Sequence, residues 1–265
     1  KSNHCGYSER DMIDFIVAIP ARYASTRLPG KPLCLIGSKP MIVHVTESAL
    51  AAGAKQVVIA TDDERVADVI NFDNVEVCLT SPSHQSGTDR LAECASILNW
   101  SDQQIIVNLQ GDEPFAPASG IRQVAELLSQ SNCHMATLAC PIHSHAQFVD
   151  PNTVKVVRNS NGHALYFSRA PIPWPRENAS QGLELALRHI GIYAYRANFL
   201  KQFSQINASL LERCESLEQL RALENGYSIA VELSNTVFPA GVDTAEDLEL
   251  ANSYWNDRHM NSKPV

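Results

Sequence analysis

The chain has 265 residues, of which 45% are hydrophobic and 19% are charged, and its formal net charge is −8 at pH 7. This composition is typical of a globular protein with a sizeable core, and the acidic balance argues against a binder of nucleic acid or anionic membranes. No apolar run approaches the roughly 18 residues of a membrane-spanning helix. The polar residues 1–11 lack the apolar segment of a secretion signal. We therefore expect a cytoplasmic protein, not inserted in a membrane, with a disordered leader at residues 1–11.

The seven cysteines indicate reduced thiols rather than disulfides or a zinc site. Their number is odd, no CxxC pair occurs, and the nine histidines are not paired with them at zinc-site spacing. Cys78 and Cys140 lie in or beside apolar runs. Such positions are typical of core thiols in a cytosolic protein.

The first half of the chain has the pattern of a parallel α/β sheet. Strand-like apolar runs fall at residues 15–19, 56–60, 75–79 and 105–109. Between and after them, helical patterns cover residues 41–53, 64–70 and 118–129. Strands that alternate with helices favour a parallel sheet with right-handed crossovers.

The pattern changes after about residue 134. Strand-like runs at residues 135–140, 153–157, 164–168 and 190–195 are joined by turns rich in Pro, Asn and Gly, as in an antiparallel or mixed sheet. A Pro-rich loop through Gly182 is a candidate mobile flap, and helical sequence at 210–225, a strand at 228–233 and a last helix from Thr244 follow. We predict a Rossmann-like, mostly parallel α/β fold flanked by helices. Its nucleotide-binding core is expected at residues 12–134 and 206–258, with a β-rich insertion at 135–205 and a tail at 259–265.

Three cations follow the first strand within a short loop. They are Arg22, Arg27 and Lys31, and no acidic residue occurs between Asp14 and Lys39 to neutralise them. Loops at the carboxyl ends of strands are where open α/β sheets bind ligands, so these charges favour a polyphosphate site over a solvated loop. The loop lacks the glycine and Ser/Thr spacing of a P-loop, and GxGxxG does not occur. Side-chain cations would therefore replace glycine amides as the phosphate ligands.

Two aspartates follow strand-like runs at positions suited to a metal ion. Asp112 comes after the run at 105–109, and Asp243 comes just before the last helix. From the residues alone, Asp112 is equally a turn residue, and Asp243 or Thr244 is equally a helix cap. Magnesium prefers oxygen ligands and takes one or two protein carboxylates besides phosphates. The pair is therefore also a candidate magnesium site.

Seven sequence blocks occur between roughly residues 15 and 250. They are the segments 14–32, 84–90 (HQSGTDR), 107–114 (VNLQGDEP), 165–169 (LYFSR), 188–196 (RHIGIYAYR), 217–221 (LEQLR) and 241–244 (GVDT). In this order they resemble the cytidylyltransferases that activate 3-deoxy-manno-octulosonate (Kdo) as CMP-Kdo. One block alone is a weak signal, but the ordered set is specific.

The resemblance implies a nucleotidyltransferase that transfers CMP from CTP to Kdo, releases pyrophosphate and serves lipopolysaccharide synthesis. It also implies the Rossmann-like fold with a β-rich insertion, Mg²⁺ as cofactor, and a homodimer to which residues 135–205 contribute. Two alternatives stay open. One is a cytidylyltransferase for another acid sugar, such as a sialic acid, and the other is a non-catalytic nucleotide-binding protein.

The resemblance also implies roles for individual residues. The expected catalytic residues are Arg22, Lys31, Asp112 and Asp243, of which Asp112 and Asp243 hold the metal. The expected nucleotide-binding residues are Pro20, Ala21, Arg22, Lys31, Ser86, Gly87 and Arg90. The expected sugar-binding residues are Gln110, Arg169, His189, Tyr193, Glu218 and Gln219.

Some of these assignments compete with structural roles. Arg169 suits a sugar carboxylate because a guanidinium fork matches carboxylate geometry. Arg90 either touches the nucleotide or packs structurally. A lone histidine such as His189 is more often structural, and Glu218 is equally a surface charge on an amphipathic helix.

Overall fold

The computed structural model describes residues 13–84, 86–176 and 183–260. The expected leader, the last residues of the expected flap (177–182) and most of the expected tail (261–265) lie outside the described residues. In the described part of the chain, no helix combines the length and the apolar character needed to cross a membrane.

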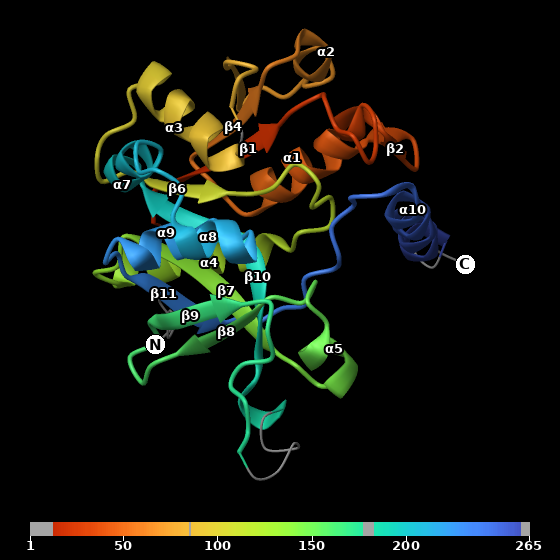
Figure 1. Ribbon diagram of the computed structural model, residues 1–265. Coiled ribbons are helices and arrows are strands. Elements are labelled where there is room, and N and C mark those ends of the chain that lie inside the picture. Colours follow the sequence, from red (N-terminus) through yellow and green to blue (C-terminus); the bar gives the residue numbers. More distant parts are fainter. Residues whose placement is uncertain (1–12, 85, 177–182, 261–265) are drawn as a thin grey trace, which may run out of the picture.

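A nine-stranded sheet organises the described residues, in the order β11-β7-β10-β6-β1-β4-β5, with β8 paired to β10 and β9 paired to β8 (Figure 1). Its strands are β1 (Phe15–Ala21), β4 (Gln56–Thr61), β5 (Val75–Leu79), β6 (Ile105–Asn108), β7 (Met135–Pro141), β8 (Lys155–Arg158), β9 (Ala164–Ser168), β10 (Leu187–Arg196) and β11 (Ile229–Leu233). The pairs of β1 with β4 and β6, of β4 with β5 and of β7 with β11 are parallel. The predicted mostly parallel sheet is confirmed.

Helices cover both faces of this sheet. They are α1 (Met41–Ala51), α2 (Glu64–Ala67), α3 (Gly87–Ile97), α4 (Ala118–Gln130), α5 (His145–Val149), α7 (Ala197–Phe203), α8 (Leu210–Glu215), α9 (Gln219–Glu224) and α10 (Ala245–Met260). A 3-10 turn, η1 (Lys31–Leu33), precedes a small antiparallel pair, β2 (Leu35–Ile36) and β3 (Lys39–Pro40). Helix α10 lies beside β2 (Figure 1) and also contacts α1, since the ring centroids of His44 and Trp255 are 4.6 Å apart.

Strand β1 packs against helices on both of its faces, which explains its continuous apolar run. Phe15, Val17 and Ile19 pack in one core cluster with side chains of α1 and α4. Ile16 and Ala18 point to the opposite face and pack in a second cluster with α3, α7 and α9. Because successive strand side chains alternate between faces, a strand buried on both faces must be apolar throughout.

Strand β10 joins the two halves of the sheet. It is antiparallel both to β6 and to β7 and lies between them. The segment 135–205 therefore contributes the antiparallel strands, as expected, but β7 and β10 are part of the main sheet. Only the β8–β9 hairpin branches from it. The expected division into a core and an insertion stays a prediction.

Two helical segments differ from the sequence expectation. The predicted helix at 210–225 is divided into α8 and α9 at Ser216, which adopts a left-handed conformation with φ 52°. Helix α3 was not expected. Ser86 caps it, since its Oγ accepts a hydrogen bond from the Asp89 amide, and the buried Leu91 and Ala95 anchor it to the sheet.

Candidate active site

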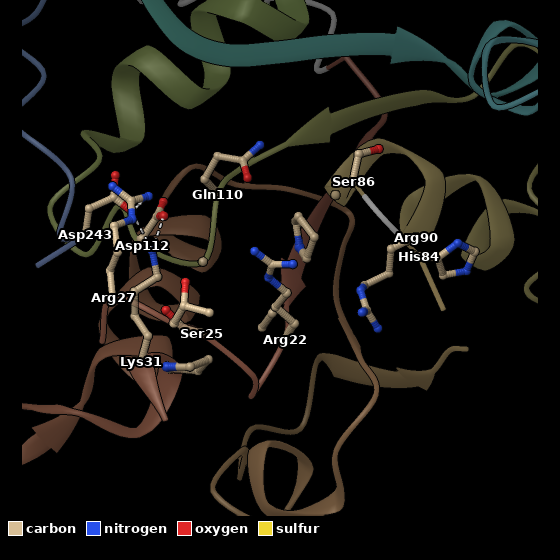
Figure 2. Close-up of a pocket in the computed structure, with 16 residues that line it drawn as sticks. Arg22, Ser25, Arg27, Lys31, His84, Ser86, Arg90, Gln110, Asp112 and Asp243 are labelled. Atoms are coloured by element: carbon tan, nitrogen blue, oxygen red, sulfur yellow. Dashed lines mark hydrogen bonds and ion pairs between the residues drawn. The ribbon is translucent and has the colours of Figure 1, made fainter. Parts of the chain in front are cut away.

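A cavity of about 250 Å³ opens at the carboxyl ends of β1 and β6 (Figure 2). Its walls are the loop after β1, the start of α3, the turn after β6 and the segment before α10. The lining residues are Pro20, Ala21, Arg22, Ser25, Thr26, Arg27, Lys31, Pro32, His84, Ser86, Gly87, Arg90, Gln110, Gly111, Asp112 and Asp243. All the expected catalytic and nucleotide-binding residues are therefore in one place, although their roles stay predictions.

Gly111 permits the close approach that forms the floor of this cavity. A Cβ atom at this position would lie 2.8 Å from the carbonyl oxygen of Pro20, which is closer than packed atoms tolerate. With glycine there, the turn after β6 passes directly against the end of β1, and Asp112 comes to face the basic loop.

Lys31 lies between the two aspartates. Its Nζ is 2.5 Å from Oδ2 of Asp112 and 3.0 Å from Oδ1 of Asp243. Nη2 of Arg27 lies 3.0 Å from the same oxygen of Asp243. Burial lowers the pKa of Lys31, but the carboxylates of Asp112 and Asp243 raise it more, so the pKa is above its ordinary value. Lys31 therefore stays positively charged in this site.

The Asp243 side chain does not cap helix α10. The backbone amides of Asp243 and Thr244 both donate to Oδ2 of Asp247, and the Asp247 amide donates to the Thr244 hydroxyl. Thr244 and Asp247 thus form the cap. The Asp243 carboxylate is left to face the cavity, where Arg27 and Lys31 contact it.

The carboxylate pair fits a magnesium ion. Asp112 and Asp243 both bring an oxygen to one cation, the Lys31 ammonium, so their oxygens converge on a common point. Among the described residues, no group of three or more His, Cys, Asp or Glu side chains forms a metal site. Magnesium usually keeps several waters and takes one or two carboxylates besides substrate phosphates. This donor set therefore suits Mg²⁺ bound together with a triphosphate.

Arg90 lines the cavity, but its guanidinium donates hydrogen bonds to residues that do not line it. Its Nη1 donates to the Thr80 hydroxyl at 2.5 Å, and its Nη2 donates to Oδ2 of Asp62 at 2.9 Å. The side chain is only 3% exposed. These contacts tie α3 to the ends of β4 and β5, which is a structural role.

His84 is a lining residue that the sequence interpretation did not select. Its Nε2 lies 2.5 Å from Oε2 of Glu93, which also accepts a hydrogen bond from the Ser81 amide. Burial raises the pKa of Glu93, but the hydrogen bonds from His84 and Ser81 outweigh it and lower the pKa. His84 could have been selected from the sequence, because it is the first residue of the HQSGTDR block. Arg27 was likewise visible as one of the three loop cations.

Three of the expected sugar residues gather at a second, smaller cavity of about 40 Å³. Tyr193, Glu218 and Gln219 line it, together with apolar or aromatic side chains of Met135, Tyr195 and Phe203. Burial raises the pKa of Glu218, and hydrogen bonds from Thr88 and Ser86 oppose this. Gln110 instead lines the large cavity and donates to Oδ1 of Asn108.

His189 is buried and neutral. Burial, with the nearby Arg188 charge, lowers its pKa to about 3. The Thr137 hydroxyl lies within 3.0 Å of the carbonyl oxygens of Ile190 and Ile192 and 2.9 Å from Nε2 of His189. Since a carbonyl only accepts, the hydroxyl proton goes to a carbonyl, and Nε2 of His189 is the donor to Thr137.

Arg169 lines neither of these cavities. Its guanidinium donates to three carbonyl oxygens, those of Glu215, Pro151 and Ser216. It thereby joins the end of β9 to the end of α8. Its expected contact with the sugar carboxylate stays a prediction.

The sequence profile of the cytidylyltransferase family matches residues 16–230 of the chain. The chain belongs to this family. Among individual cytidylyltransferases, it is 59% identical over 246 residues to the 3-deoxy-manno-octulosonate cytidylyltransferase of Xanthomonas campestris pv. campestris (strain B100), an alignment that covers 90% of this chain and 88% of the relative. It is 55% identical to the protein of the same name from Stenotrophomonas maltophilia (strain K279a), with 91% and 97% of the two chains covered.

A solved cytidylyltransferase structure has the same fold. It is CMP:2-keto-3-deoxy-manno-octonic acid synthetase complexed with CTP, and the TM-score is 0.85 at 41% sequence identity. The comparison covers 93% of this chain and all (100%) of the other. The Rossmann-like architecture predicted from the sequence is thus shared with this enzyme.

Proposed function

We propose that the protein transfers CMP from CTP to the anomeric hydroxyl of Kdo, forming CMP-Kdo and pyrophosphate. The observation that carries this proposal is the cavity in which the loop cations meet Asp112 and Asp243. Relatives that are 59% and 55% identical bear this activity in their names. Membership of the cytidylyltransferase family supports CTP as the nucleotide.

Catalysis in this site consists of positioning and charge neutralisation. Arg22 and Lys31 bind the triphosphate and hold its α-phosphorus facing the sugar, so that the reacting atoms meet in line. The anomeric hydroxyl gives up its proton to solvent, and its oxygen forms a bond to the α-phosphorus. The bond from that phosphorus to the bridging oxygen breaks, and pyrophosphate leaves. The same cations stabilise the charge that develops on the phosphate oxygens. Mg²⁺, when held by Asp112 and Asp243, supplies Lewis-acid charge neutralisation.

The acid sugar is proposed to bind beside the second cavity. There Tyr193, Glu218 and Gln219 present hydroxyl, carboxylate and amide groups, which suit the many hydroxyls of a sugar. The His189 ring lies 5.3 Å from the Tyr193 ring, centroid to centroid, at an angle of 45°, and so packs against it. Gln110 lines the large cavity, and its expected contact with the sugar stays a prediction.

The remaining expectations are also part of the proposal. We expect a cytoplasmic enzyme that serves lipopolysaccharide synthesis, with Mg²⁺ as its cofactor. We expect a homodimer through the segment 135–205, because Leu165, Trp174 and Leu185 are 60%, 71% and 70% exposed there. Apolar side chains gathered on one segment favour a covered surface.

Pyrophosphate release from CTP tests the proposal directly. The protein with CTP, Mg²⁺ and Kdo is expected to release pyrophosphate, and Asp112→Asn serves as the matched inactive control. Faster release with a sialic acid than with Kdo would favour the alternative acid sugar. CTP binding by calorimetry without any turnover would instead identify a non-catalytic nucleotide-binding protein.

A further inference from the structure

The candidate metal site already holds a cation from the protein itself. Nζ of Lys31 contacts Oδ2 of Asp112 and Oδ1 of Asp243, and Arg27 contacts that same Asp243 oxygen (Figure 2). The Lys31 side chain is 17% exposed, so it is largely withdrawn from solvent. The two carboxylates are thus neutralised by the loop that is proposed to bind the triphosphate.

A divalent ion and the Lys31 ammonium cannot share this position. Oxygen ligands hold Mg²⁺ at about 2.1 Å, and the same two oxygens now hold Nζ at 2.5 and 3.0 Å. A metal ion among them would lie within a few ångströms of the ammonium, where the repulsion between two cations is strong. Lys31 must therefore leave the aspartates before a metal binds both of them.

The same cavity offers Lys31 another partner when nucleotide is present. Lys31 sits on the short turn η1, directly after Gly30, and lysine has a flexible four-carbon stem. Arg22 lines this cavity as well, and among the ion pairs of the described residues it contacts neither aspartate. A triphosphate attracted by Arg22 would bring phosphate oxygens to Lys31 and Arg27 in exchange for the aspartates.

We propose that the Lys31 ammonium occupies the metal position in the nucleotide-free protein and so prevents a metal ion from binding Asp112 and Asp243 together. Binding of the triphosphate then moves Lys31 away and frees both carboxylates. The proposal rests on the proposed function, since it takes CTP and a divalent ion as the ligands. It makes their binding coupled, because the apparent metal affinity falls by the fraction of protein in which the aspartates are free. Metal ions then bind weakly in the absence of nucleotide, so that the site binds a metal ion tightly only together with the nucleotide.

The test measures Mn²⁺ binding to the nucleotide-free protein by electron paramagnetic resonance. Lys31→Met is expected to bind Mn²⁺ at least about tenfold more tightly than the wild type, a change that corresponds to ~1.4 kcal/mol. Arg22→Met is the matched control, because it removes the same charge from the same cavity without freeing an aspartate. A gain of less than about threefold is expected for it, since only general electrostatics changes. Lys31→Gln provides a second uncharged variant, and circular dichroism checks the fold of each.

Two outcomes would overturn the inference. One is equal Mn²⁺ affinity in the wild type and both Lys31 variants, and the other is an equal gain in Lys31→Met and Arg22→Met. In Lys31→Met/Asp112→Asn the gain should disappear, and a gain that persisted would place the bound Mn²⁺ elsewhere. CTP is expected to tighten Mn²⁺ binding more in the wild type than in Lys31→Met. These measurements need no turnover, so failure of the pyrophosphate assay would count against the proposed function and leave this result standing.

Discussion

The hydroxyl of Ser86 donates a 3.1 Å hydrogen bond to Oε1 of Glu218, which lies 132 positions further along the chain. Thr88 donates to the other oxygen of the same carboxylate at 3.0 Å. Ser86 lines the large cavity, and Glu218 lines the small one. The start of α3 is therefore a wall between the proposed nucleotide and sugar sites, and Glu218 fixes its position.

Replacing either candidate metal ligand is expected to abolish most activity. Asp112→Asn and Asp243→Asn each remove one charge from a preorganised electrostatic site and should lower turnover at least about 100-fold. Turnover with CTP, Kdo and varied Mg²⁺ is the measurement, with Asp247→Asn as a cap-only control beside Asp243. Near-normal turnover of Asp243→Asn would show that this carboxylate has no part in the reaction.

The two loop cations are expected to bind the triphosphate. Lys31→Ala and Arg22→Ala should weaken CTP binding or lower turnover without unfolding the protein, since both side chains line the cavity and neither belongs to a hydrophobic core cluster. Calorimetry with CTP at fixed Mg²⁺ measures the affinity, and Lys55→Ala, which removes a remote surface ion pair with Asp14, is the control. Unchanged affinity together with unchanged turnover would mean that the cations serve only the unliganded state.

Arg169→Lys distinguishes a structural arginine from a sugar-binding one. Lysine keeps the charge but loses the planar fork, and it cannot replace the three contacts to carbonyl oxygens. We expect a lower melting temperature with unchanged CTP affinity. If the melting temperature is unchanged and the affinity for Kdo instead falls about tenfold, or ~1.4 kcal/mol, the side chain binds the sugar carboxylate.

His189 is expected to make the protein sensitive to acid. Its pKa is about 3 in the folded protein against an ordinary value of 6.5, so between these pH values only the unfolded chain takes up a proton. The stabilising contribution is complete above pH 6.5 and is lost as the pH falls toward 3, at a cost of about 2 kcal/mol between pH 7 and 5. Urea unfolding at both pH values should show a smaller loss in His189→Gln. An identical loss in variant and wild type would rule out His189 as the origin.

The protein is expected to be a dimer at micromolar concentration. Light scattering gives the mass directly, and Trp174→Ser/Leu185→Ser is expected to shift it toward the monomer by removing exposed apolar surface. Leu79→Ser, which alters an apolar side chain on β5 that is 54% exposed, is the control. A monomeric mass for the wild type would refute the dimer.

The central strands β1, β4 and β6 were predictable from the sequence because both their faces are buried. Phe15–Ala21 has no acidic or basic side chain, and neither do its neighbours β4 and β6, which are polar only at their ends. Helix α3 was missed because its first residue is Gly87, a poor helix former that also stood among the expected nucleotide-binding residues. The apolar spacing of Leu91 and Ala95 was the signal that should have predicted it.

Other features depend on contacts that no local pattern carries. The sequence left open whether Asp243 caps a helix, and only the positions of Thr244 and Asp247 decide that it does not. The guanidinium contacts of Arg169 join a strand end to carbonyls 18 and 46 positions away. The placement of β10 between β6 and β7 likewise follows from pairing over long separations, which periodicity cannot reveal.

Strand β10, which lies between β6 and β7, also determines when the sheet can be completed during synthesis of the chain. Strand β7 has β10 and β11 as its neighbours, and both are synthesised after it. While residues 142–186 emerge from the ribosome, β7 has neither partner and β6 has only β1. Unpaired strand edges are sites of aggregation. A nascent chain that stalls before Leu187 therefore leaves both edges of β7 and one edge of β6 unpaired.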